Sequence, residues 1–295
     1  MKISFTMKKY STYLFDLYGT LVDIHTDENS KAFWRKMAAF FAKQGAVFSP
    51  EELQSKYSGY VLDETGTLAA SLQDNTPGEE RWPEIELDKV FYWLYSDKFD
   101  ENAPINNSIP LATDDTVNTL DWRHDFVNAV AVTPELLHST MEYFRRESTT
   151  HIRVYSGAVE LLRSLRATGA KVILLSNAQR TFTEAEMKAL GLWTEFDDIF
   201  ISSDYCCRKP DPHFYEAPLR KYNLKPEECL MIGNDPVNDI LGAKKAGMDA
   251  LYIHSALSPE SDNPIMLAKD NGADYMLDSM NLKKLRVMLT KCKDV

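Results

Sequence analysis

Apolar positions divide the chain into two regions of different pattern. From Val154 onward, short apolar runs alternate with stretches in which apolar residues recur at helical spacing, the pattern of strands joined by crossover helices. An earlier run, Tyr13–Phe15, predicts one more strand. The other predicted strands are 171–175, 198–202, 229–232, 250–254 and 275–277, and the predicted helices are 157–168, 184–190, 212–222, 239–247 and 282–289. We therefore predict an α/β fold with a doubly wound, mainly parallel sheet (Rossmann-like).

The region from 23 to 153 has only the helical pattern. Its apolar residues form groups at Phe33–Phe41, Val90–Tyr95 and Leu136–Phe144, and we predict no strand between them. The many Asn, Asp and Pro residues of 100–120 predict a polar loop. We therefore expect two domains: a sheet domain made of 1–22 and 154–295, and an all-helical domain, 23–153, inserted after the first strand.

Composition narrows the class of partner. The chain has 295 residues, is 44% hydrophobic and 26% charged, and has a formal net charge of −11. This charge argues against nucleic acid and anionic membranes as partners, and no apolar run is long enough for a transmembrane helix. The N-terminal segment lacks the apolar stretch of a signal peptide. The four cysteines are Cys206, Cys207, Cys229 and Cys292. They lack the spacing of a metal site, and scattered thiols of this kind suit a reducing cytoplasm.

Four short polar motifs follow successive predicted strands. They are Asp16-Leu17-Tyr18-Gly19-Thr20, Ser176-Asn177, Lys209-Pro210-Asp211-Pro212 and Gly233-Asn234-Asp235-Pro236-Val237-Asn238-Asp239. Ligands of open α/β sheets bind at the carboxyl edge of the strands, so we expect the motifs to form one site. In this order, over 8–22 and 154–280, they resemble the motifs of the haloacid dehalogenase superfamily. Members of that superfamily are hydrolases with a cap after the first motif, which the helical region 23–153 resembles.

The resemblance implies a role for each motif residue. Asp16 would be the nucleophile that forms a covalent aspartyl intermediate, and Lys209 would screen it from an anionic substrate. Ser176, Asn177, Gly19 and Lys209 would bind the substrate. Mg²⁺ would be held by Asp16, the carbonyl of Tyr18 and Asp235, while Asp239 would orient Lys209 or a metal-bound water. Asn234 stands where many relatives have an aspartate, so the sequence leaves open whether Asn234 or Asp235 faces the metal.

The choice between a phosphatase and a dehalogenase depends first on Tyr18. Most phosphatases of the superfamily have a second aspartate there, a general acid worth about 10²–10⁴-fold, and a tyrosine with a pKa near 10 replaces it poorly. The 2-haloacid dehalogenases carry tyrosine, because a halide leaves without a proton. They also work without metal and have neutral residues where this chain has Asp235. We therefore favour a Mg²⁺-dependent phosphatase that acts on a small phosphorylated metabolite through an aspartyl-phosphate. A metal-free 2-haloacid dehalogenase and a non-catalytic regulatory protein are the alternatives.

The sequence does not identify the substrate or the oligomeric state. Specificity would lie on the inward face of the cap, and the cationic candidates near the cleft are His25, Arg35, Arg145 and Arg146. Insertion into the sheet leaves two linkers, near 21–25 and 151–156. We expect the cap to hinge there and to move as a unit against the core.

Overall fold

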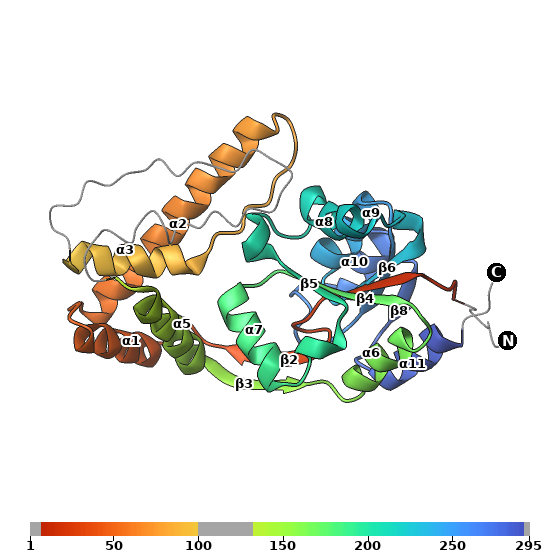
Figure 1. Cartoon of the computed structure of the whole chain (residues 1–295), viewed down its shortest axis with the longest axis horizontal. Helices are drawn as coiled ribbons and strands as arrows, with labels where there is room; N and C mark the ends of the chain where they lie inside the picture. The colour runs from red at the N-terminus through yellow and green to blue at the C-terminus, as the bar shows by residue number, and fades with distance from the viewer. Residues whose placement is uncertain (1–6, 100–131, 292–295) are drawn as a thin grey trace.

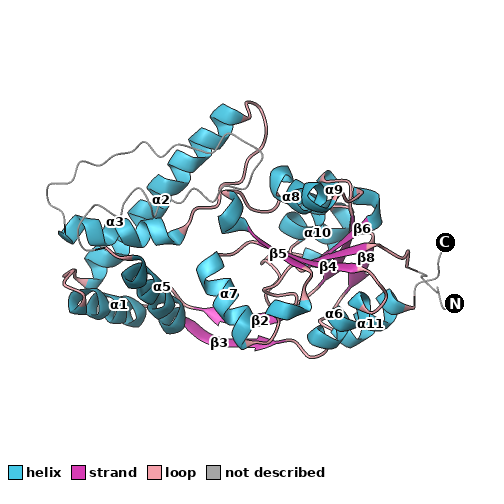
Figure 2. Ribbon diagram, in the orientation of Figure 1, coloured by secondary structure: helices cyan, strands magenta, loops and turns pink. Residues whose placement is uncertain are grey.

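A six-stranded parallel sheet forms the centre of the computed structural model, which describes residues 7–99 and 132–291. The strand order is β5-β4-β1-β6-β7-β8, and every neighbouring pair is parallel (Figures 1 and 2). This order places the first strand between β4 and β6. The strands are β1 Thr12–Phe15, β4 Lys171–Ser176, β5 Asp198–Ile201, β6 Cys229–Gly233, β7 Asp249–Ile253 and β8 Tyr275–Leu277.

Helices cover both faces of the sheet, and the side chains of β1 show why. Tyr13 and Phe15 pack with α6, α7 and α11, while Leu14, which points the other way, packs with α8, α9 and α10. A strand buried on both faces reads as an unbroken apolar run. The helices are α6 Ala158–Arg166, α7 Arg180–Ala189, α8 Pro212–Tyr222, α9 Gly242–Lys245, α10 Pro264–Asp270 and α11 Leu282–Thr290. The predicted doubly wound sheet is confirmed.

The predicted strands of this sheet agree with the observed ones to within one residue at each end. The predicted helix 239–247 is confirmed in part, because α9 lies within it and the turns before α9 are of a different kind. Its segment begins at Pro236 as a π-helix, Pro236–Leu241, which continues into α9. Single π-helical turns are rare and frequently lie at functional sites. Three single-turn 3₁₀ helices complete the core: Trp193–Glu195, Ser202–Tyr205 and Pro226–Glu228.

Within 23–99 and 132–153, four helices form the inserted region, to the left in Figure 1. They are α1 Lys31–Lys43, α2 Pro50–Asn75, α3 Leu87–Phe99 and α5 Pro134–Ser148. Their buried faces share a largely aromatic cluster that includes Phe33, Trp34, Phe41, Phe91, Tyr95 and Phe144. The helix α2 was not predicted, although Ser49 and Glu52 form a capping box at its start. The predicted loop 100–120 lies outside the described residues, as does Cys292.

An antiparallel two-stranded ribbon joins the inserted helices to the core. Its strands are β2 Val22–Thr26 and β3 Thr149–Val154, and Asp23 lies opposite Arg153, whose guanidinium is 2.6 Å from it. The expectation that no strand interrupts 23–153 was therefore wrong. Both strands mix charged or polar residues with apolar ones, so neither contains an apolar run. The ribbon occupies the two linkers at which we expected a hinge.

A second link between the inserted helices and the core was not predicted. Residues 81–86, which we call the strap, connect α2 to α3 and run beside residues 206–208 of the core. The amide of Glu84 donates to the carbonyl of Cys206 at 3.1 Å, and that of Arg208 donates to Trp82 at 2.9 Å. Arg81 forms a buried ion pair of 2.8 Å with Asp211. Motion of the inserted helices as a unit would break these contacts. Within 7–99 and 132–291, no helix is long and apolar enough to cross a membrane.

Candidate active site

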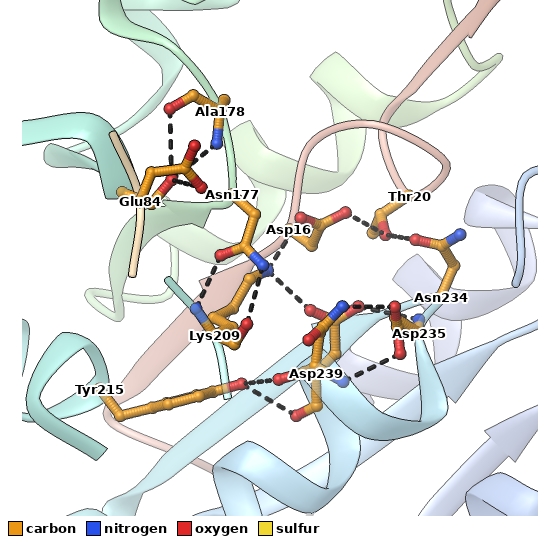
Figure 3. A network of polar contacts seen from close by, with 12 residues as sticks. Asp16, Thr20, Glu84, Asn177, Ala178, Lys209, Tyr215, Asn234, Asp235 and Asp239 are labelled. Atoms are coloured by element: carbon orange, nitrogen blue, oxygen red, sulfur yellow. Dashed lines mark hydrogen bonds and ion pairs between the residues drawn. The ribbon is translucent and has the colours of Figure 1, made fainter. Parts of the chain in front are cut away.

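The four motifs meet at one edge of the sheet. Because β1 pairs with β4 on one side and β6 on the other, Asp16, Ser176 and Gly233 come from three adjacent strand ends. Lys209 reaches the same place from the loop after β5, and Asp239 reaches it from the π-helix. Figure 3 shows the Lys209 side chain between the carboxylates of Asp16 and Asp239. The predicted convergence of the four motifs is thus present.

A buried ion cluster forms the centre of the site. The Nζ of Lys209 lies 2.9 Å from Oδ1 of Asp16 and 2.7 Å from Oδ1 of Asp239, and only 1% of the Lys209 side chain is exposed. Burial lowers the pKa of Lys209, but the charges of Asp16 and Asp239 outweigh it and hold that pKa above its usual value. Burial also raises the pKa of Asp239, against the opposing charge of Lys209. Lys209 therefore stays an ammonium that faces two carboxyl groups.

Backbone contacts fix this cluster in place. Asn177 accepts a hydrogen bond from the amide of Lys209 at 2.8 Å and donates one to its carbonyl at 3.0 Å. Asn177 was predicted to bind substrate, but here its side chain holds the Lys209 backbone. Asp239 requires the glycine at 233, since a Cβ on Gly233 would lie 2.1 Å from Oδ2 of Asp239. That oxygen accepts a hydrogen bond of 2.9 Å from the amide of Asp235.

The hydroxyl of Ser176 is buried without a partner. Its Oγ is the single buried side-chain nitrogen or oxygen among the described residues that lacks a hydrogen bond. An unsatisfied buried hydroxyl costs about 1–3 kcal/mol, so such groups are rare unless a ligand completes them. Ser176 ends β4 beside the strand that carries Asp16. It is therefore able to donate to an oxygen of a substrate bound at Asp16.

Oxygen atoms gather on the other side of the Asp16 carboxylate. The hydroxyl of Thr20 lies 3.1 Å from Oδ2 of Asp16 and 3.2 Å from Oδ1 of Asn234, so these two oxygens lie close together. Gly19 permits this approach, because a Cβ there would lie 2.4 Å from Nδ2 of Asn234 and its φ is +87°. In Figure 3, the Asn234 side chain reaches toward Thr20, which lies beside Asp16. Asn234 thus faces the position where we expect the metal.

Asp235 has a different place. Its Oδ1 accepts hydrogen bonds from the amides of Val237 and Asn238 at 2.8 and 2.9 Å, and its Oδ2 accepts one from the Asn238 side chain at 2.7 Å. Asp235 therefore caps the π-helix, as aspartate commonly does at helix N-termini. Across the described part of the chain, no three His, Cys, Asp or Glu residues cluster in a way that would hold a metal ion. This geometry does not favour Asp235 as a metal ligand, and that role stays a prediction.

Tyr18 belongs to a cluster that links core and inserted helices. Its hydroxyl donates to Oε2 of Glu186 at 2.5 Å and lies 3.2 Å from the hydroxyl of Thr183, both on α7. Arg145, on α5, forms an ion pair of 2.5 Å with Oε1 of the same Glu186 and lies over the Tyr18 ring. Burial, together with the Glu186 charge, raises the pKa of Tyr18 further above its usual value. Sequence reasoning missed Glu186, which lies 41 residues from Arg145 and in no motif.

A cavity of about 480 Å³ lies between the sheet edge and the inserted helices. Its size suits a small metabolite. Of the four cationic candidates from the sequence, Arg145 lines it. Arg35 and Arg146 are exposed, and the exposed His25 stacks on His151 in the ribbon. Its charged lining residues are Glu28, Glu84, Arg145 and Arg208, and motif residues Tyr18 and Asn177 also line it.

Comparison with known proteins places the chain in a family. A family model of haloacid dehalogenase-like hydrolases matches residues 10–247. The chain belongs to this family and is a hydrolase. Over 127 residues it is 31% identical to a phosphoserine phosphatase of Thermus thermophilus, a match that covers 43% of this chain and 51% of that protein. Over 136 residues it is 29% identical to a glyceraldehyde 3-phosphate phosphatase of Methanothermobacter thermautotrophicus, covering 45% and 59%. The chain therefore spans little more than half the length of these two relatives.

Solved structures of both a dehalogenase and a phosphatase share the fold. A 2-haloacid dehalogenase from Pseudomonas syringae superposes with a TM-score of 0.55 at 20% identity, covering 97% of this chain and 99% of the other. A phosphatase from Thermococcus onnurineus superposes with a TM-score of 0.54 at 18% identity, covering 98% and 100%. At such identities the likeness describes the fold alone. The choice between the two activities depends on the site.

Proposed function

We propose that this hydrolase is a Mg²⁺-dependent phosphatase that acts on a small phosphorylated metabolite through an aspartyl-phosphate on Asp16. The observation that carries the proposal is the unpartnered Ser176 hydroxyl beside the buried Asp16–Lys209 pair. A phosphoryl group at Asp16 would supply the acceptor that Ser176 lacks. The phosphatase relatives, which act on phosphoserine and glyceraldehyde 3-phosphate by name, support the same class of substrate. The proposed location of the enzyme is the cytoplasm.

Each residue of the cluster has a part in this chemistry. The carboxylate of Asp16 attacks phosphorus, the leaving alkoxide departs, and water then hydrolyses the acyl phosphate. Lys209 offsets the repulsion between the Asp16 carboxylate and the phosphoryl group, and Ser176 donates to a phosphoryl oxygen. Asp239 holds the ammonium of Lys209 toward Asp16. The inserted helices act as the cap that covers this site, and their cover limits the access of water to the intermediate.

The residues at the strand end suit a hard cation. Asp16 and Asn234 offer two oxygens that share the Thr20 hydroxyl, and the carbonyl of Tyr18 follows Asp16 by two residues. Mg²⁺ usually takes one or two carboxylates, substrate phosphate and several waters, so this donor set is sufficient. When bound, the ion would neutralise charge on the phosphoryl oxygens. We propose Asn234, in place of Asp235, as the third protein ligand, because its side chain faces Asp16.

One observation favours the second candidate, a 2-haloacid dehalogenase. Tyr18 is neutral, and its hydroxyl is committed to Glu186, so it gives no proton to a leaving alkoxide. A halide needs none. The cavity does contain another carboxyl group, Glu28, whose pKa burial raises against the opposing charge of Arg145. We propose Glu28 as the group that protonates poor leaving groups in the phosphatase.

A hydrolysis screen decides between these functions. Phosphate esters and 2-chloropropionate are compared side by side, each with Mg²⁺ and with EDTA. The proposal predicts hydrolysis of phosphate esters that stops on chelation and returns with Mg²⁺. Chloride release that survives chelation would establish the dehalogenase instead. Activity on neither class, from folded protein that still binds phosphate, would favour the non-catalytic alternative.

A further inference from the structure

Two arginines line the cavity, and their electrostatic surroundings differ. Arg145 forms the ion pair with Glu186 described above and reaches the Tyr18 ring. Arg208 forms no ion pair and no side-chain hydrogen bond with any residue in 7–99 or 132–291. Its guanidinium lies over the ring of Trp82, with 5.8 Å between the guanidinium carbon and the ring centre. A half-buried cation that forms no ion pair is uncommon in a chain with a net charge of −11.

The backbone on both sides of Arg208 is fixed. Its amide donates to the carbonyl of Trp82 in the strap at 2.9 Å. The next residue, Lys209, is held through both backbone groups by Asn177 and contacts the nucleophile Asp16. Arg208 thus stands one residue from the centre of the active site, on a loop tied to the core and to the strap. A ligand group on Arg208 would therefore be held at a set position relative to Asp16.

The carboxyl groups in the cavity do not neutralise Arg208. Glu84, which Figure 3 shows near Asn177 and Ala178, accepts hydrogen bonds from Gln179 at 2.9 Å and from Ser202 at 3.2 Å. Its two oxygens therefore already have partners. Burial raises the pKa of Glu84, and the charge of Arg208 opposes that rise without an ion pair. Glu28 is electrostatically linked to Arg145. The guanidinium of Arg208 is therefore available to an anion that enters the cavity.

We propose that Arg208 binds a second acidic group of the substrate, a carboxylate or a second phosphate. This inference rests on the proposed function, which places the reacting phosphoryl group at Asp16. A guanidinium presents paired N–H donors that match the two oxygens of a carboxylate or phosphate. The preferred substrates are then small metabolites with two anionic ends, one at Asp16 and one at Arg208. Esters with a single anionic group enter the cavity but leave the Arg208 guanidinium without an anionic partner.

The test measures binding, so that it does not depend on turnover. Calorimetry in excess Mg²⁺ compares three non-hydrolysable probes: ethylphosphonate with one anionic group, phosphonoacetate with an added carboxylate, and methylenediphosphonate with an added phosphonate. Wild type should bind at least one of the two-ended probes about 10-fold or more tighter than ethylphosphonate, the range of a charge-assisted hydrogen bond. Whichever of the two is preferred identifies the second group.

Arg208→Gln should reduce that preference to about 2-fold or less, and Arg208→Lys should retain part of it. The matched control is Arg146→Gln, which removes the same charge from an exposed side chain of α5 and should leave the preference unchanged. Thermal unfolding of each variant reports whether the fold is intact. An equal loss of all three probes in Arg208→Gln, or no preference in wild type, would overturn the inference.

Parallel assays with p-nitrophenyl phosphate separate the two claims. Its cleavage by wild type without any preference for two-ended probes would leave the phosphatase standing and refute the role of Arg208. A preference that depends on Arg208, in protein that cleaves no phosphate ester, would refute the phosphatase and keep the anion site.

Discussion

The two sides of the strand end that carries Asp16 differ in kind. On the core side, Lys209 and Asp239 form a charged, water-excluded cluster held by backbone contacts. On the cavity side, Tyr18 presents an aromatic ring whose hydroxyl is tied to Glu186 on α7, which in turn pairs with Arg145 of the inserted helices. The core side places a buried ammonium beside the carboxylate of Asp16. The cavity side is equipped to join two parts of the molecule.

This difference separates attack from protonation. An aspartate at position 18 would be able to protonate a leaving group. The Tyr18 hydroxyl is instead bound to Glu186, which pairs with Arg145 of the inserted helices, and it stays neutral. Leaving groups that need no proton are then favoured, unless Glu28 supplies one.

Removing the nucleophile should have the largest effect. Asp16→Asn keeps the shape of the side chain but removes the negative charge that attacks, so turnover should fall by at least about 10³-fold. Steady-state assays on p-nitrophenyl phosphate measure the loss, with mass spectrometry to exclude deamidation back to aspartate. A variant that kept more than a few percent of wild-type turnover would show that Asp16 is not the nucleophile.

Lys209→Met should damage both activity and stability. It leaves the carboxyl groups of Asp16 and Asp239 buried without their cation, which costs about 3–5 kcal/mol in comparable buried pairs. Denaturant unfolding measures this loss. The double variant Lys209→Met/Asp239→Asn should recover part of the stability but none of the activity. Equal stability of the single and double variants would show that Asp239 is not paired with Lys209 as described.

Tyr18→Asp should shift selectivity toward poor leaving groups. It restores an acid beside the nucleophile and keeps the backbone carbonyl, so turnover of alkyl phosphates should rise about 10-fold or more relative to p-nitrophenyl phosphate. The matched control is Tyr18→Phe, which removes the hydrogen bond to Glu186 and adds no acid. Glu28→Gln should lower alkyl phosphate turnover in the wild-type background. Unchanged selectivity in all three variants would mean that proton transfer does not limit the rate.

The metal-ligand assignment predicts a smaller effect. Asn234→Asp adds a charged ligand next to Asp16 and should tighten Mg²⁺ binding roughly 10-fold, measured by calorimetry. Asp235→Asn keeps a good helix cap and should change the affinity by less than about 2-fold. The reverse outcome, with Asp235→Asn abolishing metal binding, would return the ligand role to Asp235.

The sheet could be predicted closely because of how it is buried. Strands covered on both faces, such as Leu230–Ile232, are unbroken apolar runs with polar turns at both ends. The ribbon strands Val22–Thr26 and Thr149–Val154 are partly exposed and mix charged with apolar residues, so no run marks them. The strap pairs 81–86 with residues more than 100 positions later. Local pattern carries no information about such a contact.

The candidate site divides in the same way. Asp16 and Ser176 lie at strand ends, while Lys209 and Asp239 lie in the segments that follow β5 and β6. The carboxyl ends of strands in one parallel sheet share an edge, so these segments are expected to meet there. Local sequence could not decide between Asn234 and Asp235, because the choice depends on which side chain caps the next helix. Glu186 and Arg208 both depend on residues far away in the sequence. Glu186 contacts Tyr18 and Arg145, and Arg208 contacts the strap. Tertiary contacts alone reveal them.

The most direct test of the central claim is to trap the covalent intermediate on Asp16. Wild-type enzyme is mixed with p-nitrophenyl phosphate and Mg²⁺, quenched within milliseconds, reduced with borohydride, and analysed by peptide mass spectrometry. An acyl phosphate on an aspartate is reduced to homoserine, so the account predicts homoserine at position 16 and none in Asp16→Asn or without substrate. Turnover without homoserine at position 16, or with the label on another residue, would contradict the account.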